Sequence, residues 1–210
     1  MSKDRSAKAI RRNRSGGSIV NPANVLTGIR LLLIPLLVWS IIGAQWLIAA
    51  TTIALAIVTD VYDGKLARHY NSASALGGFF DHATDALLVS SSAWALAQKG
   101  LVHPWLWPLI GLAFAQYALD SKILQGRVLR TSKLGKYNGI GYYVLACTAI
   151  GSQTLAAVFQ MPLQHWPLLV QCLQWLDRGV ALAAWLLLAS TILSMAERGI
   201  HLLRKDPQDH

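Results

Sequence analysis

Charged residues are scarce in this chain. Only 14% of its 210 residues are Asp, Glu, Lys or Arg, whereas 54% are hydrophobic. A soluble domain of this length rarely has so little charge, so the composition argues against one. The apolar residues also gather in runs of about 18–22 residues, the length needed to cross a hydrocarbon core about 30 Å thick. The composition therefore predicts a single polytopic membrane domain.

Cysteine is nearly absent as well. Cys147 and Cys172 are isolated and lack the CxxC or His-rich spacing of a structural zinc site. Cys147 is expected to face lipid or the core, and Cys172 is expected to be a free interfacial thiol. A cleavable signal peptide is not expected either, because the first twenty residues are polar and basic and the first apolar run is too long.

The apolar runs predict six membrane-spanning helices, at about residues 23–43, 46–67, 77–97, 104–124, 138–158 and 178–197. The predicted fold is thus an all-α integral membrane protein in three parts. These are a basic cytoplasmic tail or interfacial helix (1–20), a six-helix transmembrane catalytic domain (21–198) and a cytoplasmic C-terminal tail (199–210). Between the last two spans, residues 159–176 are expected to form an interfacial loop or a short surface helix.

Positive charge alternates between successive connections and predicts the orientation. The connections after the second and fourth runs are basic, as are both termini, whereas the others contain almost no Lys or Arg. By the positive-inside rule, both termini lie in the cytoplasm. The basic N-terminus is then expected to contact anionic membrane lipid rather than nucleic acid. A bacterial inner membrane is the expected location.

Four aspartates interrupt the apolar background: Asp60, Asp63, Asp81 and Asp85. Each carboxylate inside a bilayer helix opposes insertion by roughly 2.5–3.5 kcal/mol, so the group needs compensation, most simply by divalent cations. Helical spacing puts the first two on one face of a helix and the last two on one face of the next. Two antiparallel helices would bring all four carboxylates together near the cytoplasmic ends of the helices. Hard cations such as Mg²⁺, Mn²⁺ or Ca²⁺ prefer such a group of oxygen ligands.

Small and basic residues accompany the aspartates. Gly64, Ala67 and Gly77 leave the helix surfaces bare, so a large phosphorylated ligand could approach the backbone closely. Small residues in membrane helices also serve helix packing, and that interpretation stays open for each of them. Arg68 adds a fork of hydrogen-bond donors that suits phosphate.

These residues form one pattern: Asp60-x-x-Asp63-Gly64-x-x-Ala67-Arg68, eight residues, then Gly77-x-x-x-Asp81-x-x-x-Asp85. The pattern resembles the signature of the CDP-alcohol phosphotransferase (phosphatidyltransferase) family at every fixed position. The resemblance implies the six-helix CDP-alcohol phosphotransferase fold, an active site that faces the cytoplasm, and a homodimer.

The same resemblance implies roles for the residues. The four aspartates would bind divalent metal, Mg²⁺ or Mn²⁺, with two ions expected. The nucleotide pocket would be lined by Asp60, Gly64, Ala67, Arg68 and Gly77. Asp85 would be the general base that takes a proton from the hydroxyl of an acceptor alcohol. That hydroxyl would attack the phosphate distal to cytidine in a CDP-linked lipid substrate, and CMP would leave.

The donor stays open between two branches of the family. The segment 21–27, with Arg30 and Pro35, resembles the opening of bacterial phosphatidylglycerophosphate synthases, and the chain has the size of enzymes that use CDP-diacylglycerol. However, His82 and Ala86 stand where those synthases commonly have Pro and Lys. Asp63-Gly64-Lys65 together with Asp81-His82 resembles instead the aminoalcohol phosphotransferases, which use CDP-choline or CDP-ethanolamine and diacylglycerol. A divalent-cation transporter is a remote alternative. Transport sites tend to lie near the midplane of the membrane, whereas these carboxylates are expected near its cytoplasmic face.

A phosphorylated acceptor, such as glycerol phosphate or inositol phosphate, would need positive charge near the carboxylates. The basic connection after the fourth run offers Arg127, Arg130, Lys133 and Lys136, although cytoplasmic loops are basic for topology alone. Lys136 is favoured because Leu134-Gly135-Lys136 resembles a loop element of the phosphatidylglycerophosphate synthase branch. Arg30 is expected to snorkel to lipid phosphate as readily as to serve the site. His82 is expected to pack rather than to contact substrate.

Overall fold

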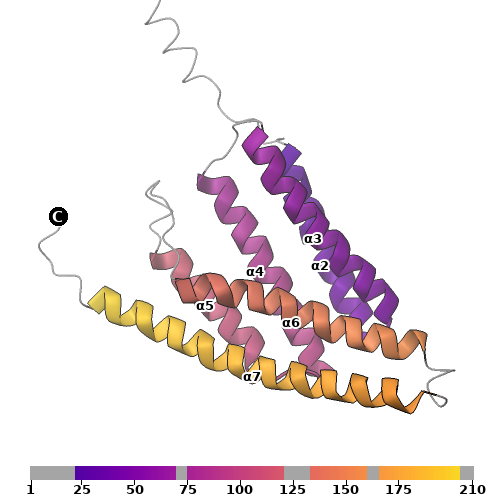
Figure 1. The fold of residues 1–210 in the computed structure, drawn as a ribbon. Coiled ribbons are helices and arrows are strands. Elements are labelled where there is room, and N and C mark those ends of the chain that lie inside the picture. The colour runs from indigo at the N-terminus through magenta and orange to yellow at the C-terminus, as the bar shows by residue number, and fades with distance from the viewer. Residues whose placement is uncertain (1–21, 70–74, 121–132, 160–165, 204–210) are drawn as a thin grey trace, which may run out of the picture.

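The computed structural model describes residues 22–69, 75–120, 133–159 and 166–203, and the regular structure of these residues is entirely helical (Figure 1). The helices are α2 (Pro22–Ile42), α3 (Trp46–His69), α4 (Ala75–Gln98), α5 (Leu106–Asp120), α6 (Lys133–Val158) and α7 (Pro167–Leu203). Successive helices run in opposite directions, and each predicted apolar run overlaps one of them. The predicted all-α fold with six helices is confirmed for this part of the chain.

Local sequence signals account for where the helices begin and end. Helix α2 begins at Pro22. Proline is tolerated at the start of a helix because the N–H groups of the first turn form no intrahelical hydrogen bond. Beyond the end of α4, Gly100 has a φ of 71°, the left-handed conformation that glycine adopts without strain. The Gly100 N–H donates to the Ala97 carbonyl (2.9 Å) and the Leu101 N–H to the Leu96 carbonyl (3.0 Å), which closes the helix with a Schellman motif.

The helices pack in a chain of contacts around one interior. Helix α2 lies against α3 and α4, α4 contacts α5 and α6, and α6 lies along α7 (Figure 1). The interior contains small and polar side chains such as Ala49, Ser92 and Thr191, whereas Leu32 (75% exposed) and Leu119 (81%) lie on the outside. Small and hydroxyl-bearing residues between helices, with large apolar residues outside, match the packing of helices in membranes.

Two stretches of the described helices are long and apolar enough to cross a membrane, judged by length and composition. They are Val25–Ile42 in α2 and Pro167–Ile200 in α7, and shorter apolar stretches cover Trp46–Tyr62 and Leu106–Leu119. Helices α3 and α4 carry the aspartates, which lower their hydropathy. Six membrane spans therefore remain a prediction, to which these two helices lend support.

The C-terminal third differs from the prediction. Residues 167–176, expected as an interfacial loop or short surface helix, form the first turns of α7, an uninterrupted helix of 37 residues and thus about 55 Å long. Pro167 can begin a helix, and the Gln, Trp and Leu residues that follow it continue one readily. The helix also runs past the predicted domain boundary at residue 198. Residues 1–20 and 204–210, predicted as tails, lie outside the described residues.

Candidate active site

Three of the four predicted aspartates meet around one arginine. Arg30 comes from α2, Asp60 from α3, and Asp81 and Asp85 from α4. Nη1 of Arg30 donates to Oδ1 of Asp81 and to Oδ1 of Asp85, at 2.8 Å each. Nη2 lies 3.0 Å from Oδ1 of Asp60. One guanidinium therefore connects carboxylates from two helices.

The buried position of Arg30 favours one of the two alternatives that the sequence left open. Instead of snorkelling to lipid phosphate, its side chain is fully buried, with an exposed fraction of 0%. Helix α2 packs against both α3 and α4, and this places Arg30 between the two acidic helices. Carboxylates within hydrogen-bond distance bind the guanidinium with fixed geometry, which a lipid headgroup at the interface does not offer.

The carboxylates lie on the open side of this cluster. The exposed fractions of the side chains are 39% for Asp60, 34% for Asp81 and 24% for Asp85, against 0% for Arg30. The carboxylates can thus be reached from outside while the guanidinium lies behind them. An exposed neighbour, His82, belongs with Asp81 and Asp85 to a group whose ligand atoms lie within 4.8 Å of one another.

The geometry of this cluster suits a divalent metal. Three carboxylates already converge on one cationic group of the protein, at 2.8–3.0 Å. Carboxylate oxygens at such a site are the ligands that Mg²⁺ and Mn²⁺ prefer. Asp60, Asp81 and Asp85, with His82 beside them, are the described residues that could hold such an ion. The Asp63 side chain lies outside the described part of the structure, although the residue is on α3, one turn after Asp60.

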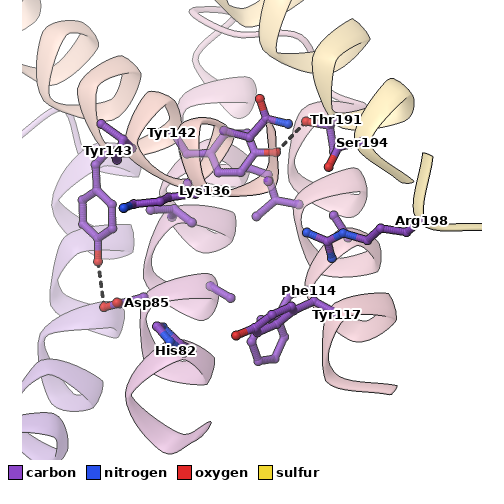
Figure 2. Close-up of a pocket in the computed structure, with 18 of the residues that line it drawn as sticks. His82, Asp85, Phe114, Tyr117, Lys136, Tyr142, Tyr143, Thr191, Ser194 and Arg198 are labelled. Atoms are coloured by element: carbon purple, nitrogen blue, oxygen red, sulfur yellow. Dashed lines mark hydrogen bonds between the residues drawn. The ribbon is translucent and has the colours of Figure 1, made fainter. Parts of the chain in front are cut away.

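A tyrosine from a fourth helix completes the surroundings of Asp85. The hydroxyl of Tyr143, on α6, donates to Oδ1 of Asp85 at 2.9 Å (Figure 2). The same oxygen accepts the hydrogen bond from Arg30. Both contacts hold the carboxylate through the same oxygen, Oδ1.

A cavity of about 400 Å³ opens beside the acidic cluster. It lies between α4, α5, α6 and α7, and Asp60 and Asp85 belong both to its wall and to the cluster. Most of the wall is apolar or aromatic, with Val89, Ile110 and Phe114 among its residues. Its volume is in the range of pockets that hold small molecules.

Positive charge enters the cavity opposite the carboxylate. Figure 2 shows Asp85 and His82 on one side of the cavity and Arg198 of α7 reaching in from the other, while Lys136 of α6 lies on the same side as Asp85 in this view. The guanidinium of Arg198 lies 5.5 Å from the ring centre of Tyr117. The hydroxyl of Tyr117 is buried and has no hydrogen-bond partner among the described residues, so it can donate to a molecule in the cavity.

Comparison with known proteins identifies the family. The sequence model of the CDP-alcohol phosphatidyltransferase family matches residues 20–196, most of the chain. This chain belongs to the CDP-alcohol phosphatidyltransferase family. The family predicted from the aspartate signature is thus confirmed. Members of this family are membrane-bound enzymes that use a divalent metal, in agreement with the apolar helices and the acidic cluster.

Several relatives match part of this chain. A "probable phosphatidylglycerophosphate synthase" of Mycobacterium tuberculosis is 34% identical over 98 residues, which cover 44% of this chain and 47% of that protein. A chloroplastic CDP-diacylglycerol–glycerol-3-phosphate 3-phosphatidyltransferase of Oryza sativa is 34% identical over 112 residues (52% and 32%). A cardiolipin synthase (CMP-forming) of Streptomyces coelicolor is 37% identical over 91 residues (40% and 41%).

The chain spans about half or less of the length of these relatives. No solved structure matches it significantly.

The remaining signature residues of the family lie on the same two helices. The backbone positions of Gly64, Ala67 and Arg68 follow Asp60 along α3, but their side chains lie outside the described residues. Gly77 is half-buried near the start of α4, one turn before Asp81. Their predicted contact with the nucleotide stays a prediction.

The predicted acceptor residues separate into three groups. Lys136 lines the cavity. Lys133 is exposed at the first residue of α6 and is not among the lining residues. Arg127 and Arg130 lie outside the described part of the chain. His82, expected to pack, lies edge-on to the ring of Tyr117 with ring centres 6.2 Å apart, and it is also exposed and lines the cavity.

Sequence reasoning missed three residues of this site. Arg198 is one of the basic residues of the C-terminus, which served only to predict the membrane orientation, yet it lines the cavity. Tyr143 belongs to no recognisable motif, and Tyr117 is one of several aromatic residues in the apolar runs. None of the three had a signal like that of Arg30, a charged residue eight positions inside an apolar helix that needs a partner.

Proposed function

We propose that this protein is a phospholipid-synthesis enzyme that transfers a phosphatidyl group from CDP-diacylglycerol to the hydroxyl of a polar alcohol and releases CMP. Family membership supports the reaction type. The relatives described above are named for CDP-diacylglycerol-dependent or CMP-forming synthesis, which favours CDP-diacylglycerol over the CDP-aminoalcohol alternative.

One observation carries the proposal. The acidic cluster opens into the cavity, and Asp85 lies at the boundary between them. A donor diphosphate bound at the carboxylates and an acceptor bound in the cavity would therefore meet at this residue. A cation transporter needs no such adjoining cavity lined by apolar and aromatic side chains.

The chemistry follows from this placement. The acceptor hydroxyl forms a new bond to the phosphorus that bears the diacylglycerol, and the bond from that phosphorus to the CMP oxygen breaks. Asp85 takes the hydroxyl proton through Oδ2, while Arg30 and Tyr143 hold Oδ1. Asp60, Asp63, Asp81 and Asp85 would hold divalent ions (Mg²⁺ or Mn²⁺, two by family resemblance), which would supply positive charge to neutralise the diphosphate. Gly64, Ala67, Arg68 and Gly77 would contact the nucleotide.

The acceptor that the cavity fits best is a small phosphorylated alcohol such as glycerol phosphate. Lys136 and Arg198 supply two positive charges to the cavity wall, and Tyr117 offers a buried hydroxyl. Two cationic groups and a hydroxyl suit a phosphate monoester. Two of the relatives are named for synthesis from glycerol phosphate or of its phosphatidyl product.

The test of the reaction is CMP release by the purified full chain in detergent with CDP-diacylglycerol and Mg²⁺ or Mn²⁺. Acceptors to compare are glycerol phosphate, inositol phosphate, inositol, serine, glycerol and phosphatidylglycerol, with product lipids identified by mass. Release that depends on glycerol phosphate is the expected result. Dependence on phosphatidylglycerol would indicate cardiolipin synthesis instead, and no release with any acceptor would refute the proposal.

Lys136 provides a sharper test of the acceptor site. Lys136→Gln should raise the KM for glycerol phosphate about tenfold or more, because a hydrogen bond to a charged group contributes about 1.5–3 kcal/mol. The KM for CDP-diacylglycerol should change little. Lys99→Gln removes a positive charge at the opposite end of α4 and should leave both constants unchanged. Equal effects on both substrates would contradict the assignment.

The membrane arrangement is part of the proposal. Six spans with both termini and the acidic cluster on the cytoplasmic side explain the alternation of positive charge. The N-terminal end of α4 and the C-terminal end of α3 lie at the same end of the bundle, as this arrangement requires (Figure 1). A homodimer is proposed from family resemblance alone.

A further inference from the structure

Arg30 contacts Asp60 and Asp81 as well as Asp85, and the proposed chemistry does not explain those two contacts. It is the largest fully buried side chain that carries a charge among the described residues, and it touches three proposed metal ligands at once. Its contacts take Oδ1 of Asp60, Asp81 and Asp85. The Arg30 guanidinium thus binds the same carboxylates that a divalent cation would bind.

Two cations that share ligands repel each other. A metal bound at carboxylate oxygens, about 2.0–2.2 Å away, would lie within a few ångströms of the guanidinium, where like charges repel strongly outside bulk water. The guanidinium also cancels one of the three negative charges of the described carboxylates. Both effects lower the affinity of the cluster for a metal while they hold the carboxylates together in its absence.

We propose that Arg30 is a built-in counter-ion that weakens metal binding to the free protein and makes tight binding conditional on a diphosphate. The negative charge of the diphosphate offsets the positive charge that Arg30 contributes. The cluster then accepts a divalent cation with substrate rather than before it. This inference rests on the proposed function, because it takes Asp60, Asp81 and Asp85 as ligands of the metal.

The test measures Mn²⁺ binding to the full chain by electron paramagnetic resonance, with and without CDP. In Arg30→Gln, Mn²⁺ alone should bind at least about tenfold more tightly than in the wild type. The factor by which CDP strengthens Mn²⁺ binding should shrink. Arg30→Lys keeps the charge and should stay within about threefold of the wild type. Unchanged or weaker Mn²⁺ binding in Arg30→Gln would overturn the proposal.

A matched control is Arg178→Gln, which removes an exposed arginine stacked on Trp175, on α7. Its Mn²⁺ affinity should equal that of the wild type. An equal gain in both variants would show a general effect of net charge and would also overturn the proposal.

Stability gives a second measurement if Arg30→Gln does not survive purification. Without Arg30 the carboxylates repel one another, and a ligand that binds only the folded state restores stability. Purification in Mn²⁺ should therefore recover folded Arg30→Gln, and loss of the variant even with Mn²⁺ would count against the proposal. These titrations need no turnover, so CMP release by the wild type decides the proposed function separately.

Discussion

Asp85 is oriented through a single oxygen. Its Oδ1 accepts from Arg30 at 2.8 Å and from Tyr143 at 2.9 Å. Such fixed hydrogen bonds preorganise a carboxylate for proton transfer, since its rotamer is set before substrate arrives. The sequence motif suggested Asp85 as the general base, but the residues that orient its carboxylate, Arg30 and Tyr143, belong to α2 and α6.

Asp85→Asn should lower CMP release about 10²–10⁴-fold, because an amide cannot accept the hydroxyl proton. The measurements are CMP release and the thermal unfolding midpoint. Asp177→Asn is the matched control: Asp177 accepts hydrogen bonds from Ser152 and Gln153 on α6, remote from the cluster, and its loss should leave the rate unchanged. A wild-type rate in Asp85→Asn would remove the assignment of the base.

Tyr143→Phe should reduce kcat about tenfold with little change in either KM, because it removes one donor to Asp85 and leaves both binding regions intact. Steady-state kinetics with CDP-diacylglycerol and glycerol phosphate measure both constants. Tyr137→Phe, on an exposed side chain of the same helix, should behave as the wild type. A rise in KM with constant kcat would show that Tyr143 binds substrate rather than orients Asp85.

At the scale of the helices, one close approach sets how α6 lies along α7. A Cβ at Gly141 would lie 2.6 Å from Cδ2 of Leu187, whereas a Cβ at Gly151, on the same helix, would meet nothing within 4 Å. The absence of a side chain at Gly141 thus allows the contact between α6 and α7. Both helices carry cavity residues, among them Lys136 and Arg198.

Gly141→Leu should therefore destabilise the protein by about 1–3 kcal/mol, the usual cost of overpacking a close contact. Gly151→Leu adds the same side chain where there is space and should change stability by much less. Thermal unfolding in detergent compares the two variants. Equal unfolding midpoints would contradict the proposed role of Gly141 in the packing of α6 on α7.

At the scale of the whole molecule, the alternating directions of the six helices divide the bundle into two ends (Figure 1). The acidic cluster lies toward the end that holds the termini of α3 and α4 near residues 69 and 75. Cys172, near the start of α7, is exposed and is a free thiol. The proposed topology puts these two features on opposite sides of the membrane.

In intact cells, a membrane-impermeant maleimide should label Cys172 only from the outside. A cysteine at Lys99→Cys should behave in the same way, since it follows α4 at the same end of the bundle. With Cys172 changed to Ser, a cysteine at Lys133→Cys should react only after the membrane is permeabilised. Labelling of Lys133→Cys in intact cells would contradict the proposed orientation.

Helices α2, α3 and α4 follow the hydrophobic runs closely, because these runs are apolar over a helix length and end at Gly or charge. Helix α2, for instance, was expected at 23–43 and covers Pro22–Ile42. Segment 167–176 was misassigned because polarity alone does not end a helix, and Trp and Gln propagate one as well as they form a loop. The acidic cluster was predicted from i,i+3 and i,i+4 spacing, which local helix geometry determines.

By itself, the sequence determined the helices, the family and the aspartates that converge, because helical periodicity and motif spacing are local properties of the chain. Only the tertiary structure decided what surrounds those aspartates. Arg30, Tyr143 and Arg198 lie 55 or more positions from Asp85 along the chain, and no local pattern relates them to it. Their convergence depends on how α2, α6 and α7 pack on α4 and α5, and packing is decided by side-chain fit across the whole bundle.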